Sequence, residues 1–179
     1  MLNKDNAVFV CIDFQEKLVL AMKEKEELID SANRMIKCMD ILEIPMIFTQ
    51  QYTKGIGETV PQIKDEVKDF SYIEKDTFDC LLTEEFKKEI MKQKGKTLII
   101  AGVEAHICVE QTVLSLLKEG FNVIILADCI ASRNPKNKDY SIRLMERAGG
   151  NIDTYESLIY KILGSSRHLK FKEISKIVK

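Results

Sequence analysis

Short apolar runs rich in β-branched residues alternate along this chain with longer segments in which apolar residues recur every three or four positions. The clear runs are AVFVCID (7–13), PMIFTQ (45–50), TLIIAG (97–102) and NVIILAD (122–128), and weaker ones are SYIEK (71–75) and NIDTY (151–155). This alternation is typical of a parallel sheet with both faces covered by helices. We therefore expect an α/β fold with about six strands.

Four segments between these runs have helical periodicity and finish near a glycine or a basic cluster. They cover residues 26–43, 83–94, 107–120 and 138–150. The segment QYTKGIGETVPQIKDE (51–66) has two glycines, a proline and no clear period, so we expect a loop there. With 179 residues and no internal repeat, the chain is expected to form a single domain over 1–179.

Charge and cysteine content narrow the class of partner. Lys and Arg number 27 and Asp and Glu number 28, which gives no reason to expect nucleic acid or an anionic membrane as partner. The apolar run at 7–12 is too short to span a membrane and lacks a signal-peptide pattern. Five cysteines without a CxxC pair fit reduced thiols. We expect a cytoplasmic protein that acts on a small molecule.

Three chemically useful residues lie at or just after the ends of predicted strands: Asp13 closes the first, Lys75 closes the short third, and Cys108 follows the fourth after a five-residue loop. In an open α/β sheet ligands gather at the carboxyl ends of the strands, and Asp13, Lys75 and Cys108 all lie at that edge. Cys108 stands where a helix is expected to begin, so free N–H groups and the helix dipole favour its thiolate. The other cysteines fit buried, inert positions: Cys11, Cys38, Cys80 and Cys129.

These residue types suit nucleophilic catalysis. A carboxylate such as Asp13 can accept the thiol proton and later return it to a leaving group, while Lys75 supplies positive charge. The main-chain amides of Glu104 and Cys108 lie in the strand-to-helix turn and can stabilise an oxyanion.

Five motifs in this order resemble those of the isochorismatase-like cysteine hydrolases. They are DFQ (13–15), EKDTF (74–78), AGVEAHICVEQT (101–112), LADCIASR (126–133) and TYESLIYKILG (154–164). The resemblance covers roughly residues 5–164, and its most specific part is the block from Gly102 to Cys108.

The resemblance implies a fold and a set of roles. The fold has three αβα layers around a six-stranded parallel sheet of order 3-2-1-4-5-6, with the strands of Asp13 and Cys108 side by side. Asp13, Lys75 and Cys108 align with the catalytic residues of the family, and the Val103–Glu104 bond aligns with its cis peptide. Members of the similar subgroup commonly assemble, so a homo-oligomer is expected.

Departures from the family patterns bear on the substrate. Metal-dependent nicotinamidases carry an Asp and two His after the second strand, whereas residues 49–60 hold no histidine and only Glu58 as an acid. Gln50 and Gln51 would serve poorly as metal ligands, so no metal and no cofactor are expected. Isochorismatases proper tend to lack the cysteine, so Cys108 favours covalent attack on an acyl carbon.

The resulting hypothesis is a metal-independent cysteine hydrolase of a small amide or related C–N bond that works through a thioester acyl-enzyme. Two alternatives stay open: a catalytically silent binding or scaffold protein, and a redox-sensing thiol protein, for which the sequence shows no resolving cysteine. The physiological substrate is open as well.

Weaker signals concern the pocket and the tail. Phe14, Gln15, Tyr52 and Phe78 flank the predicted catalytic positions and are candidates for lining a substrate pocket, although core packing or local hydrogen bonding explains them equally well. The segment 165–179 is either a short helix at a subunit contact or a frayed end.

Overall fold

The computed structural model describes residues 2–179 and contains one six-stranded parallel sheet. The strand order is β3-β2-β1-β4-β5-β6, as the resemblance implied. The strands are β1 (Ala7–Ile12), β2 (Met46–Gln51), β3 (Ile73–Lys75), β4 (Thr97–Val103), β5 (Asn122–Ala131) and β6 (Asn151–Asp153). All six predicted strands are confirmed to within a few residues.

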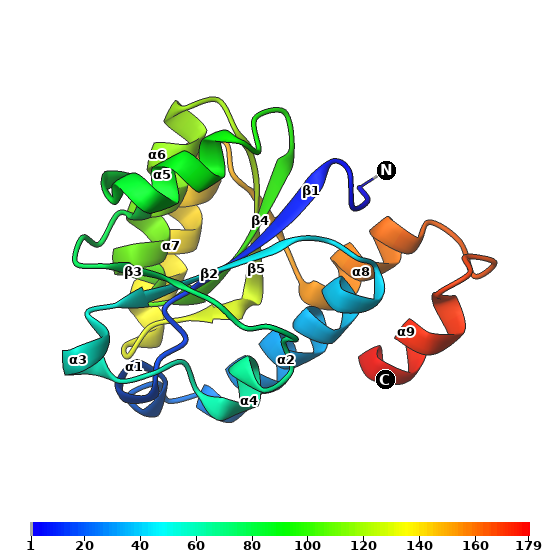
Figure 1. Cartoon of the computed structure of the whole chain (residues 1–179), viewed down its shortest axis with the longest axis horizontal. Coiled ribbons are helices and arrows are strands. Elements are labelled where there is room, and N and C mark those ends of the chain that lie inside the picture. The colour runs from blue at the N-terminus through cyan, green and yellow to red at the C-terminus, as the bar shows by residue number, and fades with distance from the viewer. Residues whose placement is uncertain (1) are drawn as a thin grey trace.

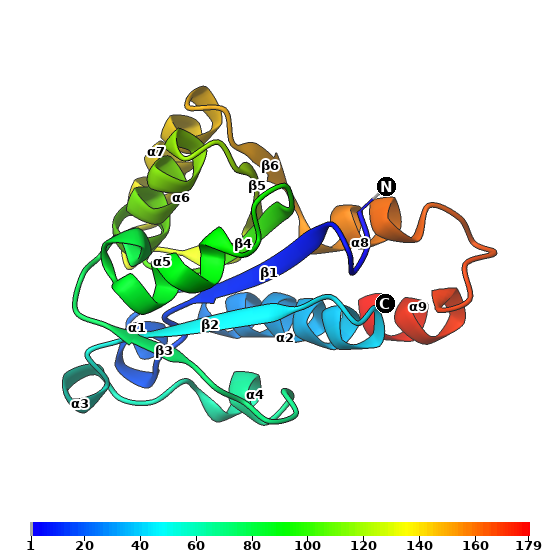
Figure 2. The ribbon, with the colours of Figure 1, turned by 45° about the horizontal axis from the view of Figure 1, so that its top comes forward.

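Helices cover both faces of the sheet and give the three predicted layers (Figures 1 and 2). One face carries α5 (Glu84–Met91), α6 (Glu110–Lys118) and α7 (Pro135–Arg147), and the other carries α2 (Lys25–Ile41), α8 (Tyr155–Leu163) and α9 (Phe171–Val178). Within residues 2–179, no helix is both long and apolar enough to cross a membrane.

Short helical turns lie between the longer elements. They are α1 (Glu16–Leu20), α3 (Thr53–Ile56), α4 (Pro61–Lys64), the 3₁₀ turn η1 (Cys80–Leu82) and the π-helical turn η2 (Ala105–Val109). The prediction of a plain loop at 51–66 was therefore wrong. Pro61 stands at the start of α4, where its fixed φ suits a helix, and Ile63 is fully buried beneath that turn.

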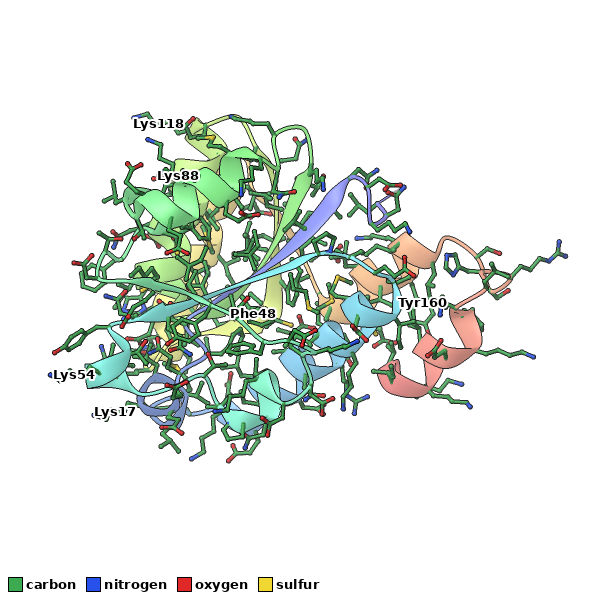
Figure 3. All side chains as sticks on the ribbon, viewed as in Figure 1. Lys17, Phe48, Lys54, Lys88, Lys118 and Tyr160 are labelled. Carbon is green, nitrogen blue, oxygen red and sulfur yellow. The ribbon has the colours of Figure 1, made fainter. Side chains whose placement is uncertain are left out.

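The core forms two apolar layers, one on each face of the sheet. Along β1 alternate side chains serve different layers: Phe9 joins the layer under α2, and Val10 joins the layer under α5 and α6. Because both faces of β1 are covered, all six of its residues are buried. Figure 3 shows Phe48 of β2 in the interior and the labelled lysines at the periphery.

The tail forms a helix that packs on the chain itself. Ile174 and Val178 of α9 are buried in the layer that includes α2. The Arg34 side chain on α2 donates a hydrogen bond of 2.6 Å from Nη1 to the carbonyl oxygen of Ile177. Of the two possibilities open from the sequence, the frayed end is therefore wrong, and the helix packs within its own chain.

Candidate active site

The backbone leaves β1 through Asp13 in a left-handed conformation. Its φ is 54°, a region that non-glycine residues rarely occupy. Neighbouring groups hold this turn, because the Asp13 N–H donates to the carbonyl of Thr49 (3.2 Å) and the Gln15 N–H donates to the carbonyl of Asp13 (2.7 Å). Strain of this kind persists only where the surroundings fix it and is common at functional sites.

Asp13 and Lys75 form a fully buried ion pair. Lys75 Nζ lies 2.6 Å from Asp13 Oδ2, and both side chains are 0% exposed. The ammonium also donates to Gln51 Oε1 at 2.6 Å and to the carbonyl of Thr77 at 3.2 Å. An ammonium has three N–H donors, so this one has none left for a substrate. A role of Lys75 in a reaction would therefore depend on its charge.

The Lys75 ammonium is held in its charged form. Burial lowers its pKa, but the charge of Asp13 and, to a lesser extent, the thiols of Cys80 and Cys108 outweigh burial and raise the pKa above its usual value.

Cys108 sits in the π-helical turn η2 and meets Asp13. Its side chain is buried, and burial raises the pKa of the thiol to about 12, helped by the charge of Asp13 and by a hydrogen bond between the thiol and that carboxylate. The charge of Lys75 opposes this rise without cancelling it. The expectation of a stabilised thiolate was therefore wrong, because loss of water around the sulfur outweighs the favourable end of a helix.

Cys80 is a neighbour of the site that sequence reasoning placed in the core. It is buried, as expected, but its N–H donates to Thr112 Oγ1 at 3.0 Å, on the helix that follows Cys108. Burial raises the pKa of the Cys80 thiol to about 12, and the charges of Lys75 and Asp13 act on it as well. In the sequence, the only sign that Cys80 lies near the site was its position five residues after Lys75.

The turn that carries Cys108 is tied to the loop after β5. The Val103–Glu104 peptide bond is cis, as the resemblance implied. The buried Glu104 carboxylate accepts one hydrogen bond from the Arg133 N–H (3.0 Å) and another from Arg133 Nε (2.9 Å). The amides of Glu104 and Cys108 bound this turn, and their role as an oxyanion hole stays a prediction.

Two further hydrogen bonds hold η2. Ser141 on α7 donates to the carbonyl of Ala105 at 2.8 Å, and His106 Nδ1 lies 2.8 Å from the Ser132 hydroxyl. His106 is thus part of the turn's framework rather than a member of the Asp13 cluster.

Gly102 lets β4 approach β1 closely at the level of the site. A Cβ at this position would lie 2.4 Å from the carbonyl oxygen of Ile12 and 2.6 Å from its Cβ. Only glycine avoids this clash, and the close contact brings the turn after β4 beside Asp13, which follows β1.

The four predicted pocket residues divide into two pairs. Phe14 is 1% exposed within the layer under α2, and the Gln15 amide bonds to the main chain of Gln51 and Gly57, so neither is available to a substrate. Both side chains fold inward, which favours core packing for Phe14 and local hydrogen bonding for Gln15, the alternatives that the sequence left open. Tyr52 and Phe78 are 56% and 54% exposed at the same edge of the sheet.

A cavity of about 510 Å³ borders Lys75. Its lining consists of Tyr52, Glu74, Lys75, Asp76, Leu82, Thr83 and Glu84. The lining therefore includes three carboxylates, those of Glu74, Asp76 and Glu84. A larger hollow of about 640 Å³ lies among α1, α2 and α4 and includes none of the predicted catalytic residues.

Glutamine amides at the end of β2 are engaged by the chain itself. Gln50 bonds to Thr59 and Thr53, and Gln51 bonds to Asp76 and Lys75. In the range 2–179, no three or more His, Cys, Asp or Glu side chains are grouped so that they could hold a metal ion. Metal independence stays a prediction.

Comparison with known families and proteins agrees with this geometry. The family model described as Isochorismatase domain matches residues 7–157. Isochorismatase domain-containing protein 2 of Xenopus laevis is 32% identical over 177 residues, which cover 98% of this chain and 84% of that protein.

Solved structures share the fold across the whole chain. A MAR1 ribonuclease from Caenorhabditis elegans has a TM-score of 0.91 at 35% identity, covering 98% of this chain and 91% of that one. YcaC from Pseudomonas aeruginosa, described with hexane-2,5-diol and covalent acrylamide, has a TM-score of 0.91 at 26% identity, covering 98% of this chain and 90% of that one. Escherichia coli YcaC, described as an octameric hydrolase of unknown specificity, has a TM-score of 0.87 at 23% identity, covering 98% of this chain and 94% of that one.

Proposed function

Because the chain belongs to the isochorismatase family, we propose that it is a cysteine hydrolase that cleaves a small amide or related C–N bond through a thioester acyl-enzyme. One observation carries the proposal: Asp13 is paired with Lys75 at 2.6 Å, and the charges of both residues act on the thiol of Cys108. Nucleophile, base and charge therefore form one contiguous cluster.

In the acylation half, the Cys108 sulfur attacks the substrate carbonyl carbon while Asp13 takes the thiol proton. The negative charge then moves to the carbonyl oxygen, where the amides of Glu104 and Cys108 donate hydrogen bonds to it. Asp13 returns the proton to the leaving nitrogen, the C–N bond breaks, and an amine departs from the thioester.

In the deacylation half, Asp13 takes a proton from a water molecule that attacks the thioester carbonyl. The C–S bond breaks, Asp13 returns its proton to the sulfur, and the acid product leaves. Lys75 stays charged throughout, since its ammonium pairs with Asp13 and has no free donor.

The high pKa of the thiol supports a base-assisted route. With a pKa of about 12, Cys108 holds almost no free thiolate near neutral pH, so attack requires proton transfer to a neighbour. Asp13 is that neighbour. The same property disfavours a redox-sensing thiol, which needs an accessible thiolate.

Two other functions are less well supported. A silent scaffold would have no reason to keep a buried charge pair beside a thiol, since an apolar core is usually at least as stable. Cleavage of RNA, named for the Caenorhabditis structure, fits poorly because Glu74, Asp76 and Glu84 line the cavity beside Lys75 and repel phosphates.

The test is mass spectrometry of the intact protein after incubation with a panel of small amides and with an RNA oligonucleotide. We expect at least one amide to add its acyl mass to Cys108, with no transfer in Cys108→Ala or Asp13→Asn. EDTA should leave transfer unchanged, because no step uses a metal. Cleavage of RNA without any acyl adduct, or chelator-sensitive hydrolysis, would contradict the proposal.

We also propose a homo-oligomer in the cytoplasm. The octameric Escherichia coli relative supports assembly, and exposed Tyr52, Phe78 and Leu82 offer apolar surface beside the cavity. All five cysteines are free, which suits a reducing compartment. Light scattering on the purified chain measures the assembly, and a monomer at micromolar concentration would contradict it.

A further inference from the structure

We infer that Thr49, on β2, is a positioning residue that holds the Asp13 carboxylate in the orientation that proton transfer from the Cys108 thiol requires. The inference rests on the proposed function, because it assigns Asp13 the part of general base. Thr49 itself touches neither the sulfur nor, in the proposed reaction, the substrate.

Thr49 holds Asp13 at two points. Its hydroxyl donates to Asp13 Oδ1 at 2.7 Å, and its carbonyl oxygen accepts the Asp13 N–H at 3.2 Å. The strand register places Thr49 opposite Ile12, one residue before the left-handed turn at Asp13. Thr49 is 1% exposed, and a buried β-branched side chain in a strand has one stable rotamer. The neighbouring strand therefore holds both the side-chain carboxylate and the main-chain N–H of Asp13.

The hydroxyl completes a set of donors around the carboxylate. Asp13 Oδ2 faces the ammonium of Lys75, which can only donate, and Oδ1 faces the Thr49 hydroxyl. A carboxylate offers about four lone-pair sites, and the remaining ones are free for the thiol proton and later for the leaving group.

Not every buried threonine here has such a partner. Thr59 is equally buried, at 1% exposure, but its hydroxyl accepts from Gln50 Nε2 at 3.0 Å in the segment after β2. It offers a matched control in which the same chemical change, Thr→Val, removes a buried hydroxyl bond away from the carboxylate.

The test measures the rate at which iodoacetamide alkylates Cys108 at pH 7, resolved by peptide mass spectrometry, in Thr49→Val, Thr49→Ser and Thr59→Val. If Thr49 orients the group that takes the thiol proton, Thr49→Val should slow alkylation by about tenfold, the equivalent of one lost hydrogen bond to a charged group. Thr49→Ser should restore the rate, and Thr59→Val should keep the wild-type rate.

An unchanged alkylation rate in Thr49→Val, or an equal loss in Thr49→Ser or Thr59→Val, would overturn the inference. If Thr49→Val does not fold, as judged by circular dichroism, Thr49→Ala makes the same deletion with less bulk. Alkylation needs no turnover. A panel without any acyl-enzyme would therefore contradict the hydrolase and leave the Thr49 result standing, whereas intact acyl transfer with an unchanged alkylation rate in Thr49→Val would remove only the role of Thr49.

Discussion

Asp13 and Lys75 neutralise each other at a place where neither side chain reaches water. Removing two charges from water costs several kcal/mol each, and their attraction repays this only while both partners are present. The Lys75 ammonium satisfies all of its donors within the chain, so the pair is also rigid. Stability and proposed catalysis thus depend on the same two residues.

Replacing Lys75 by Met should lower the free energy of unfolding by about 3 to 5 kcal/mol, because the buried Asp13 carboxylate loses its partner. Urea titration measures this loss. Lys161→Met is the matched control: Lys161 pairs with Asp153 at 2.7 Å, but its side chain is 64% exposed, so a change below about 1 kcal/mol is expected. The double variant Asp13→Asn/Lys75→Met should recover part of the loss. Equal effects at the buried and the exposed lysine would contradict the prediction.

At this scale the sequence identified which residues meet but not their protonation. Asp13, Lys75 and Cys108 could be found because each follows a strand and topology brings strand ends together. The state of the Cys108 thiol could not, since burial by the whole fold, rather than the local helix start, sets its pKa. The inward orientation of Phe14 and Gln15 was likewise not predictable, because sequence position next to Asp13 does not say which way a side chain turns.

At the scale of elements, the pairing of β1 with β4 depends on Gly102. Gly102→Ala should lower the free energy of unfolding by at least about 2 kcal/mol, because a Cβ would lie 2.4 Å from the Ile12 carbonyl oxygen and the strands would have to separate. The same separation would displace Asp13 from Cys108, so alkylation and acyl transfer should change as well.

Gly120→Ala separates the steric effect from the backbone effect. Gly120 has a φ of +81°, but a Cβ added there would meet no atom within 4 Å, so only its left-handed conformation is penalised, by about 1 kcal/mol. Thermal or urea unfolding compares the two variants, and a larger loss at Gly120 would contradict the steric explanation.

The long elements were predictable and the short ones were not. Strands such as TLIIAG and helices such as α2 span enough residues for a period to show, whereas α3 and α4 are single turns of four residues. The π-helical turn η2 is also invisible in the sequence, because its apolar residues continue the pattern of the helix that follows it.

At the scale of the whole molecule, the five cysteines make the fold sensitive to alkali. Burial raises the pKa of Cys38, Cys80 and Cys108 from the ordinary value of 9.0 to about 12, and those of Cys11 and Cys129 rise well above it. Below pH 9 both states keep these protons. Between pH 9 and 12 the unfolded chain loses them while the folded chain holds them, so stability falls as pH rises.

Each thiol should contribute a slope approaching about 1.4 kcal/mol per pH unit in this window. Urea titrations at pH 8, 9, 10 and 11 measure the total. In Cys38→Ala the slope should decrease by one such contribution, whatever the change in stability at pH 8. A flat dependence from pH 9 to 11 would show that the thiols ionise equally in both states.

Because β1 lies in the middle of the sheet, the proposed site can form only after the later strand β4 has been made. Ala7 pairs with Thr97 and Ile12 with Gly102, so the first strand made during synthesis waits for a partner that emerges some ninety residues later. Until β4 is made, the apolar strand β1 lacks its second neighbouring strand. Chaperones protect exposed strands of this kind. Asp13 leaves the ribosome early and Cys108 late, so a nascent chain carries the proposed base for seconds before the proposed nucleophile is made.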